Sequence, residues 1–123
     1  MKLGLIIGRF QPLHNGHVAL IQKAMDENDA VLVLVGSQGK LPNYKNPFST
    51  QVVVSHIEQE FEKYDKIYVK GIQDYPSNDE WIEDVIGRVN TIVDDPSATT
   101  IYTSERDMEF YKNNFLYQVE SVW

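Results

Sequence analysis

Five short apolar segments alternate with segments of helical periodicity, and this alternation constrains the fold more than any other feature of the sequence. The apolar segments, which we expect to be strands, are Leu3–Ile7, Ala30–Val35, Lys66–Ile72, Thr99–Thr103 and Tyr117–Val122. Ala30–Val35 contains only Ala, Val and Leu, which is typical of a strand buried on both faces. Strands that are separated by helices pair in parallel. We therefore expect an α/β fold with a parallel sheet of about five strands and helices on both faces.

Helices are expected between these strands. They are His17–Asn28, a helix from Ser49 to about Tyr64, a helix beginning at Asn78, and Asp107–Asn113. Ser49 and Asn78 are placed as N-caps because their side-chain oxygens can accept a hydrogen bond from a free backbone N–H of the first turn. Ligands of such sheets bind beyond the carboxyl ends of the strands. We therefore expect the chemistry in the loops after the first three strands, including the long loop Gly36–Phe48.

Length and charge narrow the class of protein. The 123 residues suit one domain, and the formal net charge of −7 argues against a nucleic-acid partner, which would favour a basic surface. The acidic excess lies in residues 62–123, whereas residues 1–61 carry five acids and five bases and suit an anionic ligand better. The absence of cysteine excludes disulfides and thiolate metal sites. No apolar run is long enough for a membrane span or a signal sequence, so we expect a cytoplasmic protein without a membrane partner, and a homo-oligomer stays possible.

The segment between the first strand and the following helix brings together groups that suit a phosphate. It reads Gly8-Arg9-Phe10-Gln11-Pro12-Leu13-His14-Asn15-Gly16-His17. Gly8 and Gly16 allow a ligand to approach the backbone, and the helix N-terminus adds free N–H groups and the positive end of the helix dipole. His14 and His17 are about one helical turn apart, so they can face the same side. With Arg9 nearby, this junction is the strongest candidate site in the sequence.

Two other interpretations of the histidines are weaker. Surface or core histidines beside an ordinary turn would be the usual interpretation of such a pair, but the glycines and the strand–loop–helix setting favour a ligand. A zinc site has too few ligands, because His56 is the only other histidine and no carboxylate stands beside the pair at ligand spacing. We therefore expect no metal site built from the chain's own residues.

Gly8-Arg9-Phe10-Gln11-Pro12 followed by His14-Asn15-Gly16-His17 resembles the HxGH signature of the nucleotidylyltransferase superfamily. The spelling is most similar to that of the nicotinamide mononucleotide (NMN) adenylyltransferases of archaea and of the adenylyltransferase half of bacterial enzymes fused to a Nudix hydrolase. Lys45–Phe48 is similar to the loop before the second helix in that group, and Asp74–Trp81 resembles its acceptor-binding segment. The resemblance implies a Rossmann-like sheet.

The resemblance also implies an activity and a set of site residues. The reaction would be adenylyl transfer from ATP to NMN, giving NAD and pyrophosphate, with Mg²⁺ accompanying ATP. His14 and His17 would be catalytic. The residues implied in ATP binding are Gly8, Arg9, Phe10, Gly16, Lys45 and Arg106, and those implied in acceptor binding are Tyr75, Asn78 and Trp81. Trp81 has a second interpretation as a core residue, because it stands one residue before the apolar stripe of its helix.

The sequence departs from the family pattern at two places. Ser49–Val53 stands where the family commonly has a Glu-Arg pair. The family's Ser/Thr-rich segment, which ends in Arg and binds phosphates, would follow the fifth strand, and we expect a single domain 1–123 that lacks it. Two alternatives therefore remain open. One is a transferase for another phosphorylated acceptor, such as pantetheine phosphate, riboflavin phosphate or a polyol phosphate, and the other is a non-catalytic nucleotide-binding domain.

Overall fold

The strands form one parallel sheet in the order β3-β2-β1-β4-β5. This computed structural model describes residues 1–38 and 48–122. The strands are β1 (Leu3–Gly8), β2 (Ala30–Gln38), β3 (Ile67–Gln73), β4 (Thr99–Thr103) and β5 (Gln118–Ser121). All the pairings between these strands are parallel. The expected fold class is confirmed, and each strand lies close to its expected position.

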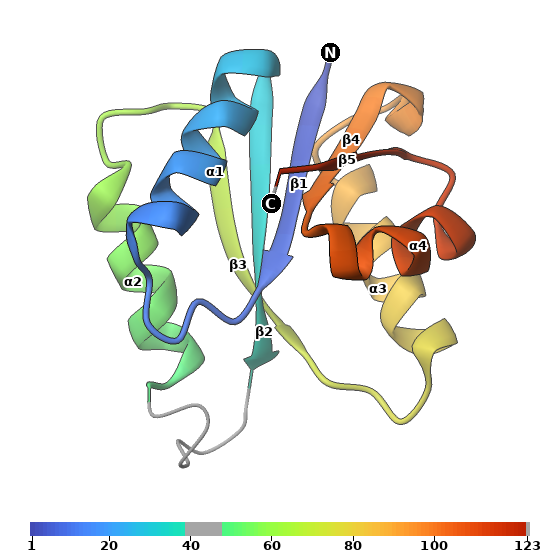
Figure 1. The fold of residues 1–123 in the computed structure, drawn as a ribbon, viewed down its shortest axis with the longest axis horizontal. Helices are drawn as coiled ribbons and strands as arrows, with labels where there is room; N and C mark the ends of the chain where they lie inside the picture. Colours follow the sequence, from blue (N-terminus) through green and yellow to red (C-terminus); the bar gives the residue numbers. More distant parts are fainter. Residues whose placement is uncertain (39–47, 123) are drawn as a thin grey trace.

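Helices connect the strands and cover both faces of the sheet. They are α1 (Asn15–Glu27), α2 (Thr50–Glu60), α3 (Asn78–Asn90) and α4 (Glu105–Asn114), with a short 3-10 helix, Pro96–Ala98, before β4. One face is covered by α1 and α2 and the other by α3 and α4 (Figure 1). Within the described ranges, no helix is long and apolar enough to cross a membrane.

Burial on both faces explains why β2 is apolar without alternation. Val31, Val33 and Val35 belong to the core cluster beneath α1 and α2. Leu32 and Leu34 belong to the cluster beneath α3 and α4. Successive side chains of a strand point to opposite faces, and both faces of β2 are covered by helices. A polar residue in this run would therefore be buried within one of the two apolar clusters.

The order of the strands reverses at β1. This strand pairs with β2 on one side and with β4 on the other. The chain moves outward from β1 through β2 to β3, and then crosses back to place β4 on the opposite side of β1. The connections on the two sides of β1 therefore pack on opposite faces, and a crevice opens between the carboxyl ends of β1 and β4.

The starts of α1 and α3 differ from expectation because another side chain provides the N-cap. His14 caps α1, which therefore begins at Asn15 and not at His17. The expected Asn78 cap is wrong, because the Oγ of Ser77 accepts a hydrogen bond from the backbone N–H of Glu80 at 3.3 Å. The expected Ser49 cap of α2 is confirmed, with Oγ accepting from the N–H of Val52 at 3.2 Å.

Other element ends also differ. The helix α2 ends at Glu60, before the expected Tyr64, and α4 begins at Glu105, two residues before the expected start. The strand β2 continues to Gln38, so the expected loop Gly36–Phe48 starts later than its first glycine.

Candidate active site

His14 and His17 form one hydrogen-bonded unit at the start of α1. The Nδ1 of His14 accepts a hydrogen bond from the backbone N–H of Gly16 at 3.1 Å. The Nδ1 of His17 accepts one from the backbone N–H of His14 at 3.3 Å. The two rings stack, with centroids 3.6 Å apart and an angle of 23° between their planes. The prediction that both face the same side is confirmed.

These hydrogen bonds determine where the imidazole protons lie. A ring nitrogen that accepts from a backbone N–H carries no proton itself, so each neutral ring carries its proton on Nε2. Burial, and next the nearby His14, lower the pKa of His17 to about 4. His17 is therefore neutral at pH 7 and presents an Nε2–H donor that its own capping bond leaves free.

The side chain of Phe10 packs against the ring of His17. Its backbone φ of 50° lies in the left-handed region, which residues other than glycine rarely adopt. The residue is only 5% exposed, and its ring meets the ring of His17 edge-on, with centroids 4.8 Å apart. A Cβ added at Gly8 would lie 3.2 Å from the Phe10 ring, so glycine at this position leaves room for that ring.

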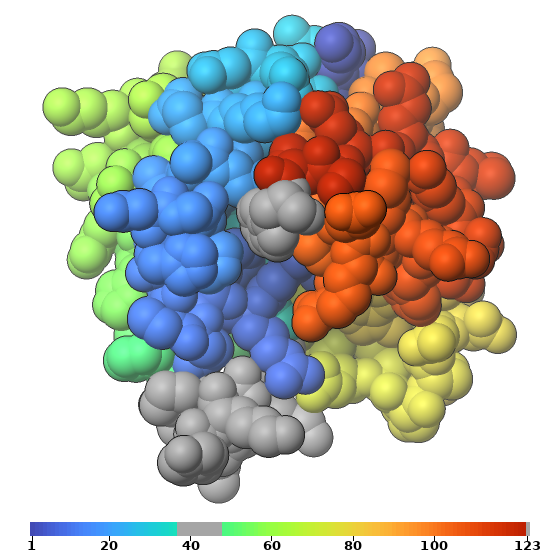
Figure 2. All heavy atoms as spheres, in the orientation of Figure 1, coloured from blue at the N-terminus to red at the C-terminus, as the bar shows by residue number. Residues whose placement is uncertain are grey.

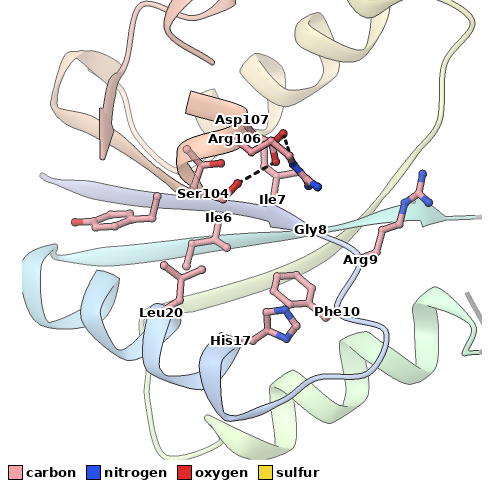
Figure 3. A pocket seen from close by; sticks show the side chains of 12 residues that line it. Ile6, Ile7, Gly8, Arg9, Phe10, His17, Leu20, Ser104, Arg106 and Asp107 are labelled. Atoms are coloured by element: carbon pink, nitrogen blue, oxygen red, sulfur yellow. Dashed lines mark hydrogen bonds and ion pairs between the residues drawn. The ribbon is translucent and has the colours of Figure 1, made fainter. Parts of the chain in front are cut away.

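A pocket of about 180 Å³ opens beside this unit, between the carboxyl ends of β1 and β4. Its lining residues come from the end of β1, the β1–α1 segment, the first turns of α1, the end of β4 and the start of α4. They are Ile6, Ile7, Gly8, Arg9, Phe10, His17, Leu20, Tyr102, Thr103, Ser104, Arg106 and Asp107. Phe10, His17 and Leu20 lie on one side of β1, and Ser104, Arg106 and Asp107 lie on the other (Figure 3). Figure 2 shows that the β1–α1 segment (blue) and α4 (orange) lie on the same face of the molecule.

The start of α4 supplies the polar wall of the pocket. Ser104 is the N-cap of α4, but its Oγ lies 3.3 Å from Oδ2 of Asp107, to which it donates, and it makes no side-chain cap bond. The Nε of Arg106 lies 3.4 Å from Oδ1 of Asp107, and the Arg106 side chain is 87% exposed. Such an exposed pair is weak, so the guanidinium can turn to an anionic ligand at little cost.

This pocket meets the expectation that the chemistry follows the first three strands only at the first strand, and most of the loop after the second strand lies outside the described residues. The pocket is built from the segments after the first and fourth strands, because β4 is the neighbour of β1. The predicted residues Gly8, Arg9, Phe10, His17 and Arg106 are brought together there. The lining residues that the sequence did not single out as binding groups are Ile6, Ile7, Leu20, Tyr102, Thr103, Ser104 and Asp107. The position of Ser104 directly after an expected strand was the one available signal.

Tyr75, Asn78 and Trp81 lie elsewhere, between the end of β3 and the first turn of α3, and they do not line this pocket. The hydroxyl of Tyr75 donates to Oδ2 of Asp84 at 2.8 Å, and this hydrogen bond raises the pKa of Tyr75. The Nε of Arg88 donates to the other oxygen of Asp84 at 3.1 Å. Asn78 is exposed.

The ring of Trp81 has aromatic neighbours in α4 and at its C-cap. Its centroid lies 6.2 Å from that of Phe110 and 6.3 Å from that of Phe115. Trp81 is partly buried against the cluster beneath α3 and α4, so these contacts support the core interpretation. They leave its role toward an acceptor as a prediction.

Lys45 lies outside the described residues. In the part of the chain that the structure describes, no group of three or more His, Asp or Glu side chains is arranged to hold a metal ion.

Most of this chain matches known proteins in sequence and in fold. The cytidylyltransferase-like family matches residues 5–120. The nicotinamide-nucleotide adenylyltransferase of Methanococcus aeolicus is 37% identical over 79 residues, which cover 63% of this chain and 46% of that protein. The nicotinamide/nicotinic acid mononucleotide adenylyltransferase of Acinetobacter baylyi is 31% identical over 109 residues, which cover 87% of this chain and 58% of that protein.

A solved structure agrees with these matches. The bifunctional NMN adenylyltransferase/ADP ribose pyrophosphatase from Francisella tularensis superposes with a TM-score of 0.91 and 25% identity, covering 98% of this chain and 37% of that one. A second structure of that enzyme, complexed with AMP and a Mn ion, gives a TM-score of 0.89 with 25% identity, covering 99% of this chain and 37% of that one. The chain spans about half the length of the curated relatives that it matches. The match over residues 5–120 shows that the chain belongs to the cytidylyltransferase-like family.

Proposed function

We propose that this domain transfers the adenylyl group of ATP to NMN, giving NAD and pyrophosphate. The observation that carries the proposal is the stacked pair of histidines at the N-terminus of α1, of which His17 lines a pocket between β1 and β4. The names of the relatives support the choice of NMN as acceptor. The crevice at the point where the strand order reverses is where nucleotides bind in sheets of this kind.

The reaction needs orientation and charge stabilisation more than proton transfer. An oxygen of the acceptor phosphate attacks the α-phosphorus of ATP, the bond from that phosphorus to the bridging oxygen breaks, and pyrophosphate leaves with the electron pair. The attacking oxygen is already ionised at pH 7, so no general base is required. The Nε2–H groups of His14 and His17 would donate to the phosphate oxygens that gain charge. The free backbone N–H groups at the start of α1 would also stabilise the negative charge on these phosphate oxygens.

Mg²⁺ enters this proposal as part of the substrate Mg–ATP. The described residues offer no cage of their own for the ion. Asp107 is the one carboxylate among the pocket residues, and it is already engaged with Arg106 and Ser104. The ion would lower the repulsion between the phosphates and the approaching acceptor.

The acceptor would bind toward Tyr75, Asn78 and Trp81 at the same edge of the sheet. Because the hydroxyl of Tyr75 is bound to Asp84, this residue would offer its ring and not its hydroxyl. Trp81 would offer only the part of its ring that Phe110 and Phe115 leave uncovered. Stacking is the interaction that such surfaces provide to a nicotinamide ring.

The test is to incubate the protein with ATP, Mg²⁺ and NMN or its deamidated acid, and to measure the dinucleotide and pyrophosphate formed. We expect His17→Ala to lower kcat about 10²-fold or more, the scale for losing one preorganised donor to a developing charge. His56→Ala, which changes an exposed histidine on α2, is the matched control. ATP binding without any pyrophosphate would contradict the proposal and favour a nucleotide-binding domain. Transfer only to another phosphorylated acceptor would contradict the choice of NMN.

A further inference from the structure

The side chain of Gln11 makes two hydrogen bonds to the backbone of Phe48, a residue distant in the sequence. Nε2 of Gln11 donates to the carbonyl oxygen of Phe48 at 2.8 Å, and the backbone N–H of Phe48 donates to Oε1 of Gln11 at 2.9 Å. A side-chain amide carries a donor and an acceptor side by side, as a peptide group does. The pair therefore repeats the way in which one residue of a strand bonds to its neighbour, and it fixes both the distance and the direction of the amide.

The two residues belong to segments that both lie at the carboxyl edge of the sheet. Gln11 lies in the β1–α1 segment, shortly before the N-cap His14. Phe48 directly precedes Ser49, the N-cap of α2. The start of α2 is also bound to β2, because Oγ1 of Thr50 donates to the carbonyl of Gly36 at 3.2 Å. The first turn of α2 is thus connected to β2 through Thr50 and to the histidine-bearing segment through Gln11.

The residue before Gln11 connects this amide pair to the histidines. Phe10 has the left-handed backbone conformation described above, and its buried ring contacts His17. Such a conformation persists only where surrounding contacts stabilise it. Two consecutive side chains therefore anchor the β1–α1 segment. Phe10 packs into the core beside α1, and Gln11 is hydrogen-bonded to Phe48 at the start of α2.

We propose that Gln11 is a positioning residue, which holds the histidine pair at a fixed place relative to the N-terminus of α2. The expected loss of turnover on changing Gln11 rests on the proposed function, whereas the expected displacement of the histidine pair does not. Gln11 needs no contact with the substrate, because both of its polar side-chain atoms are engaged with Phe48. Displacing aligned groups by about 1 Å can lower turnover about 10²-fold, so a residue without a substrate contact can still be needed for the rate.

The test compares changes at Gln11 with the same changes at Gln59, which is exposed on α2. Gln11→Ala removes both hydrogen bonds. Gln11→Glu keeps the size of the side chain but sets a carboxylate oxygen against the carbonyl of Phe48, and it carries the test if the alanine variant does not fold. We expect both Gln11 variants to lower kcat about 10-fold or more at saturating substrates, with the melting temperature close to that of the wild type. We also expect faster hydrogen exchange at the Phe48 amide and shifted NMR signals of the His17 ring.

The Gln59 variants should change none of these measurements. A kcat for Gln11→Ala equal to that for Gln59→Ala would overturn the proposal. A lowered melting temperature with unchanged kcat would show a structural role only, and would overturn it as well. If the wild-type protein transfers no adenylyl group to any acceptor, the proposed function fails, and the NMR measurements then decide the present inference. Shifted His17 signals in Gln11→Ala would support it, and unchanged signals would overturn it.

Discussion

At the scale of single residues, the histidine pair does two things with one set of hydrogen bonds. His14 occupies the N-cap position and His17 the N3 position, so together they form a capping box in which imidazoles replace the usual Ser or Thr and Glu. The same bonds place the proton of each neutral ring on Nε2. The start of α1 and the proposed donors therefore depend on each other, and a change in the charge of His17 should affect both.

The lowered pKa of His17 predicts how stability varies with pH. Its pKa is about 4 in the folded chain and 6.5 ordinarily, with burial as the larger cause and His14 as the smaller. Between these values the unfolded chain binds more protons, so this contribution is fully present above pH 6.5 and is lost as the pH falls through about 4. His17→Gln removes the titration and keeps a capping acceptor at N3. We expect the free energy of unfolding to fall more steeply over this range in the wild type than in His17→Gln.

Urea unfolding at a series of pH values measures this difference directly. His56→Gln is the control, because it removes an exposed histidine from the middle of α2. Parallel curves for the wild type and His17→Gln would show that folding does not lower the pKa of His17, and would contradict the burial that is assigned to this ring.

A glycine between the histidines gives a second prediction at this scale. A Cβ added at Gly16 would lie 2.9 Å from Cε1 and 3.1 Å from Nδ1 of His14, so Gly16→Ala must displace that ring. At Gly87, within α3, an added Cβ meets nothing within 4 Å. We expect Gly87→Ala to stabilise the protein by about 0.5–1 kcal/mol through helix propensity, and Gly16→Ala to be neutral or destabilising and to lower turnover. Calorimetry and the transfer assay check both, and a stable, fully active Gly16→Ala would contradict the assigned position of His14.

At the scale of elements, the sequence predicts the strands better than the helix ends. Ala30–Val35 was found because burial on both faces requires an uninterrupted apolar run, whatever its neighbours are. The start of α1 was missed because His14 caps it, and histidine is not among the usual capping residues. Ser77 and Asn78 are adjacent and both are good caps, so only the backbone path decides between them.

The packing of α3 against α4 gives a prediction for Trp81. Its ring contacts Phe110 and Phe115, and Trp81→Ala would leave a gap between these helices. Because Trp81 is only partly buried, we expect a loss of about 2–3 kcal/mol, below the range for fully buried aromatic residues. Trp81→Phe should retain most of that stability and still raise KM for NMN more than KM for ATP. An unchanged KM for NMN in Trp81→Phe, measured beside urea unfolding, would leave Trp81 with a packing role only.

At the scale of the whole molecule, the site depends on a strand order that local patterns do not contain. Alternating strands and helices predict a parallel sheet, but they fit several orders of strands. Placing β4 beside β1 is what brings Ser104 and Arg106 opposite His17. The motif before α1 could therefore be found from the sequence, whereas the opposite wall of the pocket required the topology. That topology depends on contacts between residues distant in the sequence, among them those of Tyr102.

The side chain of Tyr102 connects β4 to α1, the helix that follows β1. Its hydroxyl accepts from Nδ2 of Asn28 at 2.8 Å and donates to Oε1 of Glu27 at 2.9 Å, which joins β4 to the end of α1. Nζ of Lys23 lies 3.1 Å from Glu27 and 3.3 Å from Glu120, which extends the connection to β5. In this network the side chains of residues 1–61 bond directly to those of residues 62–123, and Tyr102 is its most buried residue.

We expect Tyr102→Phe to destabilise the protein by about 1–3 kcal/mol, because it removes two partly buried hydrogen bonds, one of them to a charged group. The loss should be limited, because Asn28 still donates to the carbonyl of Ala24 at 2.8 Å and Glu27 keeps its contact with Lys23. Tyr68→Phe removes the same hydroxyl from an exposed residue of the edge strand β3, and should have little effect. Urea unfolding of both variants near pH 7 makes the comparison, since burial raises the pKa of Tyr102 to about 12 and keeps the hydroxyl protonated. Equal stabilities of the two variants would show that β4 is held beside β1 by backbone pairing and apolar packing alone, without a contribution from this network.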